Sequence, residues 1–287
     1  MNTYNFSAPK CIEAFLDKMR EKAELIGLSD KTVFRDPCGI DNETTPRDVL
    51  KWLIFGSKCE KLQSIWSAAN HTVEFKGENS RKMEIISTVV ADAASHVLTD
   101  YYNVLGGKTG TLKKHSAWNL AFIAQVADCN ELFACVIMYA EEPNTQMKNR
   151  FQAAKEAMDI AVKKYKNRSL DVSKETVCAG GAIVAAVDEN GEDFEILFEQ
   201  NGDDMKVPAS MTKILTASVG LEYIKDTKEK ITVRQEVLDI IPKYFYVEDF
   251  KAGDEVRISD ILHAMMLPSS NAAAYILAEY AGNIILS

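Results

Sequence analysis

The segment Pro208-Ala209-Ser210-Met211-Thr212-Lys213 contains a residue pair that could carry out chemistry. The segment is predicted to leave a loop and begin a helix. Residues three apart lie on one helix face, so Ser210 and Lys213 would point into one space. A serine hydroxyl needs a base within hydrogen-bond reach, and a lysine can serve if burial or nearby positive charge lowers its pKa. The pair therefore predicts nucleophilic catalysis, with N–H groups of the helix N-terminus available to a developing oxyanion.

Two further motifs supply partners for this pair. The segment Pro268-Ser269-Ser270-Asn271 lies in a predicted loop and contains Ser-x-Asn, and Gly106-Gly107-Lys108-Thr109-Gly110 opens a strand-like segment and contains Lys-Thr-Gly. Each motif alone has an ordinary structural explanation, as an exposed helix face, a helix cap or a turn. The three together match the signature of penicillin-binding proteins and class A β-lactamases, which makes coincidence a poor explanation.

Over most of its length the chain resembles the serine D-alanyl-D-alanine carboxypeptidases, the low-molecular-weight penicillin-binding proteins. Four segments carry the resemblance: 207–213, 267–273 with the Ala-rich helix after it, 32–41 and 44–48. The resemblance implies a β-lactamase/transpeptidase-like α/β (α+β) fold and hydrolysis of the terminal D-Ala-D-Ala bond through an acyl-enzyme. It implies acylation by β-lactams and no cofactor. It also implies an extracytoplasmic location, in the cell envelope.

The resemblance assigns a role to each catalytic residue. Ser210 attacks the peptide carbonyl, and Lys213 accepts the proton of its hydroxyl. Ser269 and Asn271 relay protons and orient Lys213 and the substrate amide. Lys108 adds positive charge, which would help lower the pKa of Lys213 and attract the terminal carboxylate of the substrate.

Substrate-binding roles fall mostly on the third motif and the residue after it. Thr109 would donate a hydrogen bond to the substrate carboxylate. Gly110 would let the substrate lie against the strand, and the N–H groups of Ser210 and Thr111 would form the oxyanion hole. Arg150 matches a family arginine near the carboxylate pocket. An exposed charge at a helix end is the alternative explanation of Arg150.

The motifs occur in a different order from that of the family, in which the nucleophile comes first and Lys-Thr-Gly last. Joining Ser287 to Met1 would restore the family order, and residues 166–175, rich in charge and Ser, would be the linker that joins the family's original ends. The order therefore predicts a circular permutant. A segment cut from a tandem array of two such domains would show the same order. Pairing of the halves between chains would give a swapped dimer in place of a monomer.

The resemblance implies a single transpeptidase-like domain over 1–287, and hydrophobic patterning divides it into two lobes. Residues 106–226 form mainly the sheet lobe, with helices over 149–165 and 210–226 against the faces of a five-stranded antiparallel sheet. The predicted strands cover 108–114, 117–126, 131–139, 180–187 and 194–199. Residues 1–105 and 227–287 form mainly an all-helical lobe, although the pattern over 71–103 fits strand or helix.

Composition and charge exclude other classes of function. The 287 residues are 47% hydrophobic and can bury a large core. A formal net charge of −9 without clustered basic residues argues against nucleic acid or an anionic membrane as partner. No apolar run approaches about 18 residues, and the first ten lack the pattern of a signal peptide. The six cysteines and four histidines show no metal-ligand spacing, so no metal is expected.

Two other functions share this site chemistry. A class A β-lactamase needs an additional Glu to activate the deacylating water. In the permuted order that Glu would lie within 1–107, where none occupies a Glu-x-x-Leu-Asn setting. A β-lactam sensor domain that is acylated without turnover would carry the same three motifs, and only its deacylation rate would distinguish it. The expected partners are the peptidoglycan stem peptide and β-lactam antibiotics as inhibitors.

Overall fold

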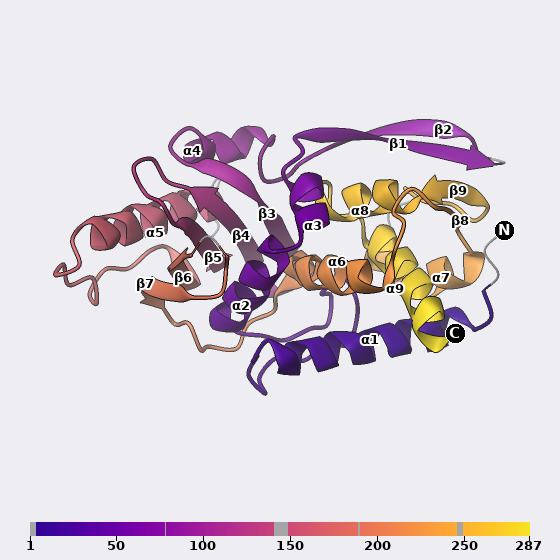
Figure 1. The fold of residues 1–287 in the computed structure, drawn as a ribbon, viewed down its shortest axis with the longest axis horizontal. Coiled ribbons are helices and arrows are strands. Elements are labelled where there is room, and N and C mark those ends of the chain that lie inside the picture. The colour runs from indigo at the N-terminus through magenta and orange to yellow at the C-terminus, as the bar shows by residue number, and fades with distance from the viewer. Residues whose placement is uncertain (1–3, 78, 141–148, 189, 246–248) are drawn as a thin grey trace.

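The larger sheet of the protein has five antiparallel strands in the order β3-β4-β5-β6-β7 (Figure 1). The computed structural model describes residues 4–77, 79–140, 149–188, 190–245 and 249–287. The strands are β3 (Asn103–Leu112), β4 (Ala117–Gln125), β5 (Leu132–Ala140), β6 (Ala179–Val187) and β7 (Phe194–Gln200). The predicted sheet is thus confirmed. Its central strands are almost continuously apolar because both faces of the sheet are covered.

Helices cover the two faces of this sheet. On one face lies α5 (Asn149–Lys166), which packs through Phe151 and a row of alanines. On the other lie α2 (Pro46–Ser57) and α6 (Thr212–Tyr223) (Figure 1). The sequence assigned α2 to the helical lobe. It lies on the sheet instead because its side chains Leu50 and Leu53 join the apolar cluster that contains the inner face of β4 and β5.

The second lobe is not all-helical, so that part of the fold prediction is wrong. It contains a four-stranded sheet in the order β2-β1-β9-β8. The strands are β1 (Asn70–Gly77), β2 (Arg81–Ile86), β8 (Lys230–Thr232) and β9 (Asp254–Arg257). In β1, Val73 and Phe75 are buried while their neighbours face outward, which is the period-two pattern of a half-buried strand. The strands β8 and β9 are too short to give a clear pattern.

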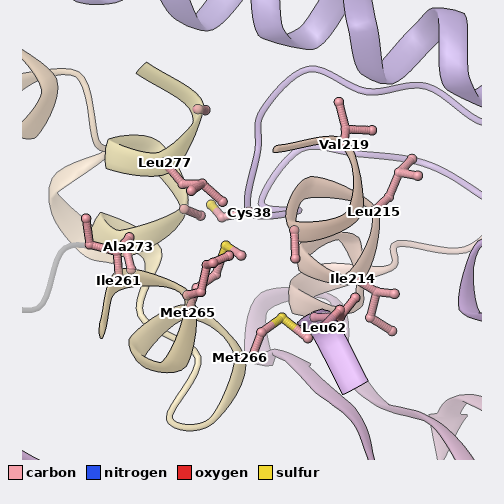
Figure 2. Close-up of a cluster of buried hydrophobic side chains, with 14 of the residues drawn as sticks. Cys38, Leu62, Ile214, Leu215, Val219, Ile261, Met265, Met266, Ala273 and Leu277 are labelled. Atoms are coloured by element: carbon pink, nitrogen blue, oxygen red, sulfur yellow. The ribbon is translucent and has the colours of Figure 1, made fainter. Parts of the chain in front are cut away.

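This lobe also contains helices, and several of them pack against α6. The helices of the lobe are α1 (Ala8–Leu25), α3 (Glu60–Trp66), α7 (Gln235–Asp239), α8 (Ile258–Met266) and α9 (Asn271–Leu286), and α4 (His96–Thr99) lies near the sheet lobe. Figure 2 shows apolar side chains of α6, α8 and α9 meeting around Cys38. Every residue from Thr212 to Leu221 of α6 is buried. None of the described helices is both long and apolar enough to cross a membrane.

The first and last described segments lie side by side at one end of the molecule (Figure 1). The N–H of Asn5 donates to Oδ1 of Asn283 at 3.0 Å. In the adjoining interface, α1 packs on α9 so closely that a Cβ on Gly282 would lie 1.9 Å from the carbonyl oxygen of Cys11. The two helices therefore form one continuous layer, although they are far apart in the sequence.

Candidate active site

The candidate nucleophile lies on a strained turn just before α6. Ala209–Met211 form a turn of 3-10 helix, and α6 begins at Thr212, so Ser210 precedes the helix that was predicted to contain it. Ala209 has a φ of 49°, a left-handed conformation that is uncommon for a residue with a side chain. Close backbone packing holds the turn: a Cβ on Gly39 would lie 1.9 Å from Ala209 O, and one on Gly110 would lie 2.7 Å from Pro208 O.

Lys213 Nζ lies among acceptors from the first two motifs. It is 2.9 Å from Ser210 Oγ, 2.9 Å and 3.2 Å from the carbonyl oxygen and Oγ of Ser269, and 2.6 Å from Asn271 Oδ1. The side chain is fully buried. Because burial disfavours the ammonium form, it lowers the pKa of Lys213 to about 8. A lysine with this pKa beside a hydroxyl can act as its general base.

The Ser-x-Asn motif is fixed by the ends of two helices. After α8, the N–H of Ser270 donates to Ala264 O at 2.9 Å, and Ser270 Oγ then caps α9 by accepting from Ala273 N. Ser269 lies between these contacts in a left-handed conformation, with a φ of 76°. The amide Nδ2 of Asn271 donates to Phe245 O at 2.8 Å. Its Oδ1 therefore faces Lys213 in a defined orientation.

The Lys-Thr-Gly motif lies in β3, next to the turn Ala209–Met211, which is called here the nucleophile turn. Lys108 is fully buried, and its Nζ donates to Thr109 O at 3.1 Å. Burial first, and then the positive charges of Lys213 and Arg150, lower the pKa of Lys108 well below its usual value. The sequence assigned Lys108 a part in lowering the pKa of Lys213, whereas the structure identifies burial as the cause. Thr109 Oγ1 lies 2.8 Å from Thr88 Oγ1.

Arg150 is buried behind β3 and is not an exposed helix-end charge. Its Nη2 donates to Thr111 Oγ1 at 2.9 Å, and its Nη1 donates to Asn119 O at 3.1 Å. The side chain is only 6% exposed, and burial lowers its pKa to about 10. The side chain of Thr111 is exposed on the strand. Arg150 thus reaches the site through Thr111.

A cavity of about 710 Å³ continues the site beyond Ser269. Its lining comes from three segments: residues 83–88 and 91–93, Phe245 and Asp249, and residues 268–271. Thr88 joins this wall to the motifs, because its N–H and hydroxyl both donate to Leu267 O and its Oγ1 lies beside that of Thr109. The volume is typical of a ligand site. The ambiguous pattern of 71–103 gave no signal for Thr88.

Sequence reasoning also missed Asn119, which ties β4 to the nucleophile turn. Its Nδ2 donates to Val207 O at 2.9 Å and to Pro208 O at 3.1 Å, while its Oδ1 accepts from Tyr139 N. The residue is fully buried. A signal was available, because an asparagine within an otherwise apolar strand needs hydrogen-bond partners. Asn119 is therefore a structural support of the site.

The structure brings the three motifs together from distant parts of the chain. Lys213 bonds directly to Ser269 and Asn271. The third motif joins through the contact of Gly110 with Pro208 and through the hydrogen bond between Thr109 and Thr88 of the cavity wall. Among the described residues, no group of three or more His, Cys, Asp or Glu is placed to hold a metal ion. The arrangement suits acyl transfer by a serine with a lysine base.

One of three comparisons with known proteins found a match. A search of curated proteins and a search of solved structures each found no match. The family model of D-alanyl-D-alanine carboxypeptidases matches residues 168–284, which is less than half of the chain. The matched region contains Ser210, Lys213, Ser269 and Asn271, whereas Lys108 lies outside it. The match supports the D-alanyl-D-alanine carboxypeptidase family and, with it, a hydrolase of the carboxypeptidase type with a function related to peptidoglycan.

Proposed function

We propose that this chain is a serine D,D-carboxypeptidase that removes the terminal D-Ala from peptidoglycan stem peptides through an acyl-enzyme on Ser210. The observation that carries the proposal is the buried Lys213 amine, 2.9 Å from Ser210 Oγ and with a pKa lowered to about 8. Such a lysine is partly unprotonated near neutral pH and can accept the serine proton. A substrate of this class implies that the protein acts in the cell envelope. β-Lactams would acylate the same serine.

Acylation uses the hydrogen bonds of the first two motifs. As Ser210 Oγ attacks the carbonyl carbon of the penultimate D-Ala, Lys213 Nζ takes its proton. The N–H groups of Ser210 and Thr111 stabilise the oxyanion. The proton then passes through Ser269 to the nitrogen of the departing D-Ala, while Asn271 Oδ1 keeps the Lys213 ammonium in place. Water attacks the acyl-enzyme afterwards, with Lys213 again as the base.

The third motif and its surroundings bind the substrate. The terminal carboxylate would lie near Lys108, Thr109 and Thr111. An arriving anion favours the protonated form of Lys108 and so offsets the effect of its burial. Arg150 holds the Thr111 hydroxyl at 2.9 Å and adds positive charge behind the strand. The peptide that precedes D-Ala-D-Ala would extend into the cavity beside Ser269.

The test is the intact mass of the protein after incubation with benzylpenicillin. Wild type is expected to gain one penicillin, and Ser210→Ala none, because the ester bond forms on this hydroxyl. Ser64→Ala, which changes an exposed serine, is the control and is expected to react like wild type. Rapid hydrolysis of penicillin without a lasting adduct would indicate a β-lactamase. Neither adduct nor hydrolysis would contradict the proposal, as would equal reaction of Ser210→Ala.

We also propose that the chain order is circularly permuted relative to the family. Three observations support this. The family match begins at residue 168, directly after α5, and extends almost to the end of α9. The strands β3, β4 and β5 precede this region in the sequence but continue the sheet of β6 and β7. Asn5 lies beside Asn283. All three motifs meet within one chain, which supports a site formed without exchange between copies.

A re-ordered chain tests the permutation. It would start at Lys174, run to Ser287, continue through a six-residue Gly/Ser linker into Met1 and end at Ser173. We expect it to fold cooperatively and to form the penicillin adduct, because the opened loop is exposed and the joined segments are neighbours. A chain opened between Ala121 and Phe122, inside the buried β4, is the control that should not fold. Failure of the first chain to fold would contradict the permutation.

A further inference from the structure

Residues 36–42, called here the Asp36 loop, fold around a buried carboxylate. Asp36 Oδ1 accepts from the N–H groups of Cys38, Gly39 and Ile40 at 2.8, 2.5 and 3.1 Å. Asp36 Oδ2 accepts from the N–H of Asp41 at 2.8 Å. The side chain is 7% exposed. Four N–H donors on one carboxylate fix the path of the loop.

The Asp36 loop packs against the backbone that carries Ser210. Gly39, with a φ of 89°, lies so close that a Cβ would be 1.9 Å from Ala209 O and 2.6 Å from Thr212 Oγ1. The amide of Asn42 donates to Thr212 Oγ1 at 3.3 Å. One turn further along α6, Thr216 Oγ1 donates to Pro37 O at 2.6 Å. The loop therefore packs against both the nucleophile turn and the first turn of α6 and supports their positions.

The loop touches Thr212, the residue before Lys213, and the carboxylate of Asp36 acts electrostatically on that lysine. Burial lowers the pKa of Lys213, while Cys38, Asp36 and Asp249, in that order, act in the opposite direction. Cys38 lies in the core between α6 and α9 (Figure 2), and burial raises the pKa of its thiol well above the usual value. At neutral pH the thiol is therefore uncharged, and of the two remaining acidic groups Asp36 acts more strongly on Lys213 than Asp249 does.

Other titratable groups face this region from the surrounding elements. Lys108 on β3 interacts with Lys213 as a second positive group. Asp249, before β9, lines the cavity, and burial raises its pKa. Tyr275 on α9 lies near the loop, and burial first, then Cys38 and Asp36, raise its pKa. Of the two carboxylates, Asp36 belongs to the loop that also touches the nucleophile turn.

We propose that Asp36 is a positioning residue of the reaction, whose loop fixes the turn that carries Ser210 and whose carboxylate sets the charge behind Lys213. This inference rests on the proposed function and assigns a role to a residue outside the three motifs. Burial alone would push a lysine far toward the neutral amine, and a weakly basic amine is a poor proton acceptor. A fixed anion behind Lys213 limits that loss of basicity, so that the pKa of the base stays close to the working pH.

The pH dependence of acylation tests the role of the charge. In wild type the rate with benzylpenicillin should rise with pH as Lys213 loses its proton, with a midpoint near pH 8. Asp36→Asn removes a charge that favours the ammonium, so this limb should move to lower pH by about 0.5–1 unit. Asp41→Asn removes an exposed carboxylate of the same loop and should leave the limb in place. A folded Asp36→Asn variant with an unmoved limb would overturn the proposal.

Two further measurements test the role of Asp36 if Asp36→Asn does not fold or the protein shows no activity. Asp36→Ser, whose hydroxyl can still accept from loop N–H groups, carries no charge and is titrated in parallel in case the amide variant does not fold. The Lys213 Cε resonance, assigned by its loss in Lys213→Arg, gives the lysine pKa directly by NMR and needs no enzymatic activity. If wild type forms no penicillin adduct, the proposed function fails. If the Cε titration does not shift in Asp36→Asn, the role of Asp36 fails independently.

The contact with the nucleophile turn has its own test. Gly39→Ala places a Cβ against Ala209 O and should lower the acylation rate at every pH without moving the acid limb. Gly27→Ala is the matched control, because Gly27 also has a positive φ but a Cβ there would meet nothing within 4 Å. An unchanged acylation rate in folded Gly39→Ala would overturn the positioning role. A rate lowered equally in Gly27→Ala would overturn it too.

Discussion

Replacing Lys213 with Ala is expected to lower the rate of acylation by benzylpenicillin by about 10³-fold, the usual contribution of a positioned general base. The reason is geometric, because the amine lies 2.9 Å from Ser210 Oγ. Lys225→Ala changes an exposed lysine beyond the other end of α6 and should react at the wild-type rate. Stopped-flow measurement of adduct formation gives both rates. A loss of less than tenfold in Lys213→Ala would show that another group takes the proton.

The same variant should also lose the pH dependence of acylation. Below its pKa of about 8 Lys213 is an ammonium and cannot accept a proton, so the wild-type rate falls as pH falls. At pH 6 roughly 1% of the lysine is unprotonated, which predicts a rate about 100-fold below the plateau. The residual rate of Lys213→Ala should be nearly constant over this range. A limb that persists in the variant would belong to a different group.

Replacing Gly282 with Ala is expected to lower the free energy of unfolding by about 3 kcal/mol, near the upper end for overpacked sites. The new Cβ would lie 1.9 Å from Cys11 O, and both positions are backbone, so α1 and α9 must separate. Intrinsic helix propensity predicts the opposite sign, since Ala in place of Gly inside a helix usually stabilises by about 1 kcal/mol. Urea denaturation followed by circular dichroism measures the change.

Gly220→Ala is the matched control for this prediction. Gly220 also lies inside a helix, but a Cβ there would meet only the side chain of Leu277, at 3.2 Å. That side chain can move by a few tenths of an ångström, so the change should be far smaller than at Gly282. If the two variants have the same free energy of unfolding, the close contact between α1 and α9 at Gly282 does not limit the stability of the protein.

The candidate catalytic groups could be found from the sequence because the proposed chemistry requires fixed residue types at short spacing. Ser210 and Lys213 are separated by one helical turn, and Ser269 and Asn271 by one residue. The supporting residues could not be found this way. Asp36, Thr88 and Asn119 act through contacts with segments distant in the sequence. A polar residue in an apolar strand, such as Asn119, signals a need for hydrogen-bond partners, but no local pattern identifies those partners.

The same distinction between local patterns and distant contacts explains which parts of the fold could be predicted. The strands β4 and β5 are long apolar runs bounded by turn residues, and these signals are local. The second sheet was missed because β8 and β9 have three and four residues, and pairing with β1 defines them more than their own sequence does. The covering of the main sheet by α2 likewise depends on tertiary packing, since an amphipathic helix can cover any apolar face.

The burial of α6 on every side has a consequence for how the protein loses activity. Lys213 is fully buried in the first turn of this helix, and Thr212–Leu221 contribute directly to the central core. Local openings start where few buried contacts hold a segment, and α6 is the opposite case. Heat or denaturant should therefore remove penicillin binding and helical signal in one transition. A partly unfolded form that exposes Lys213 is therefore not expected.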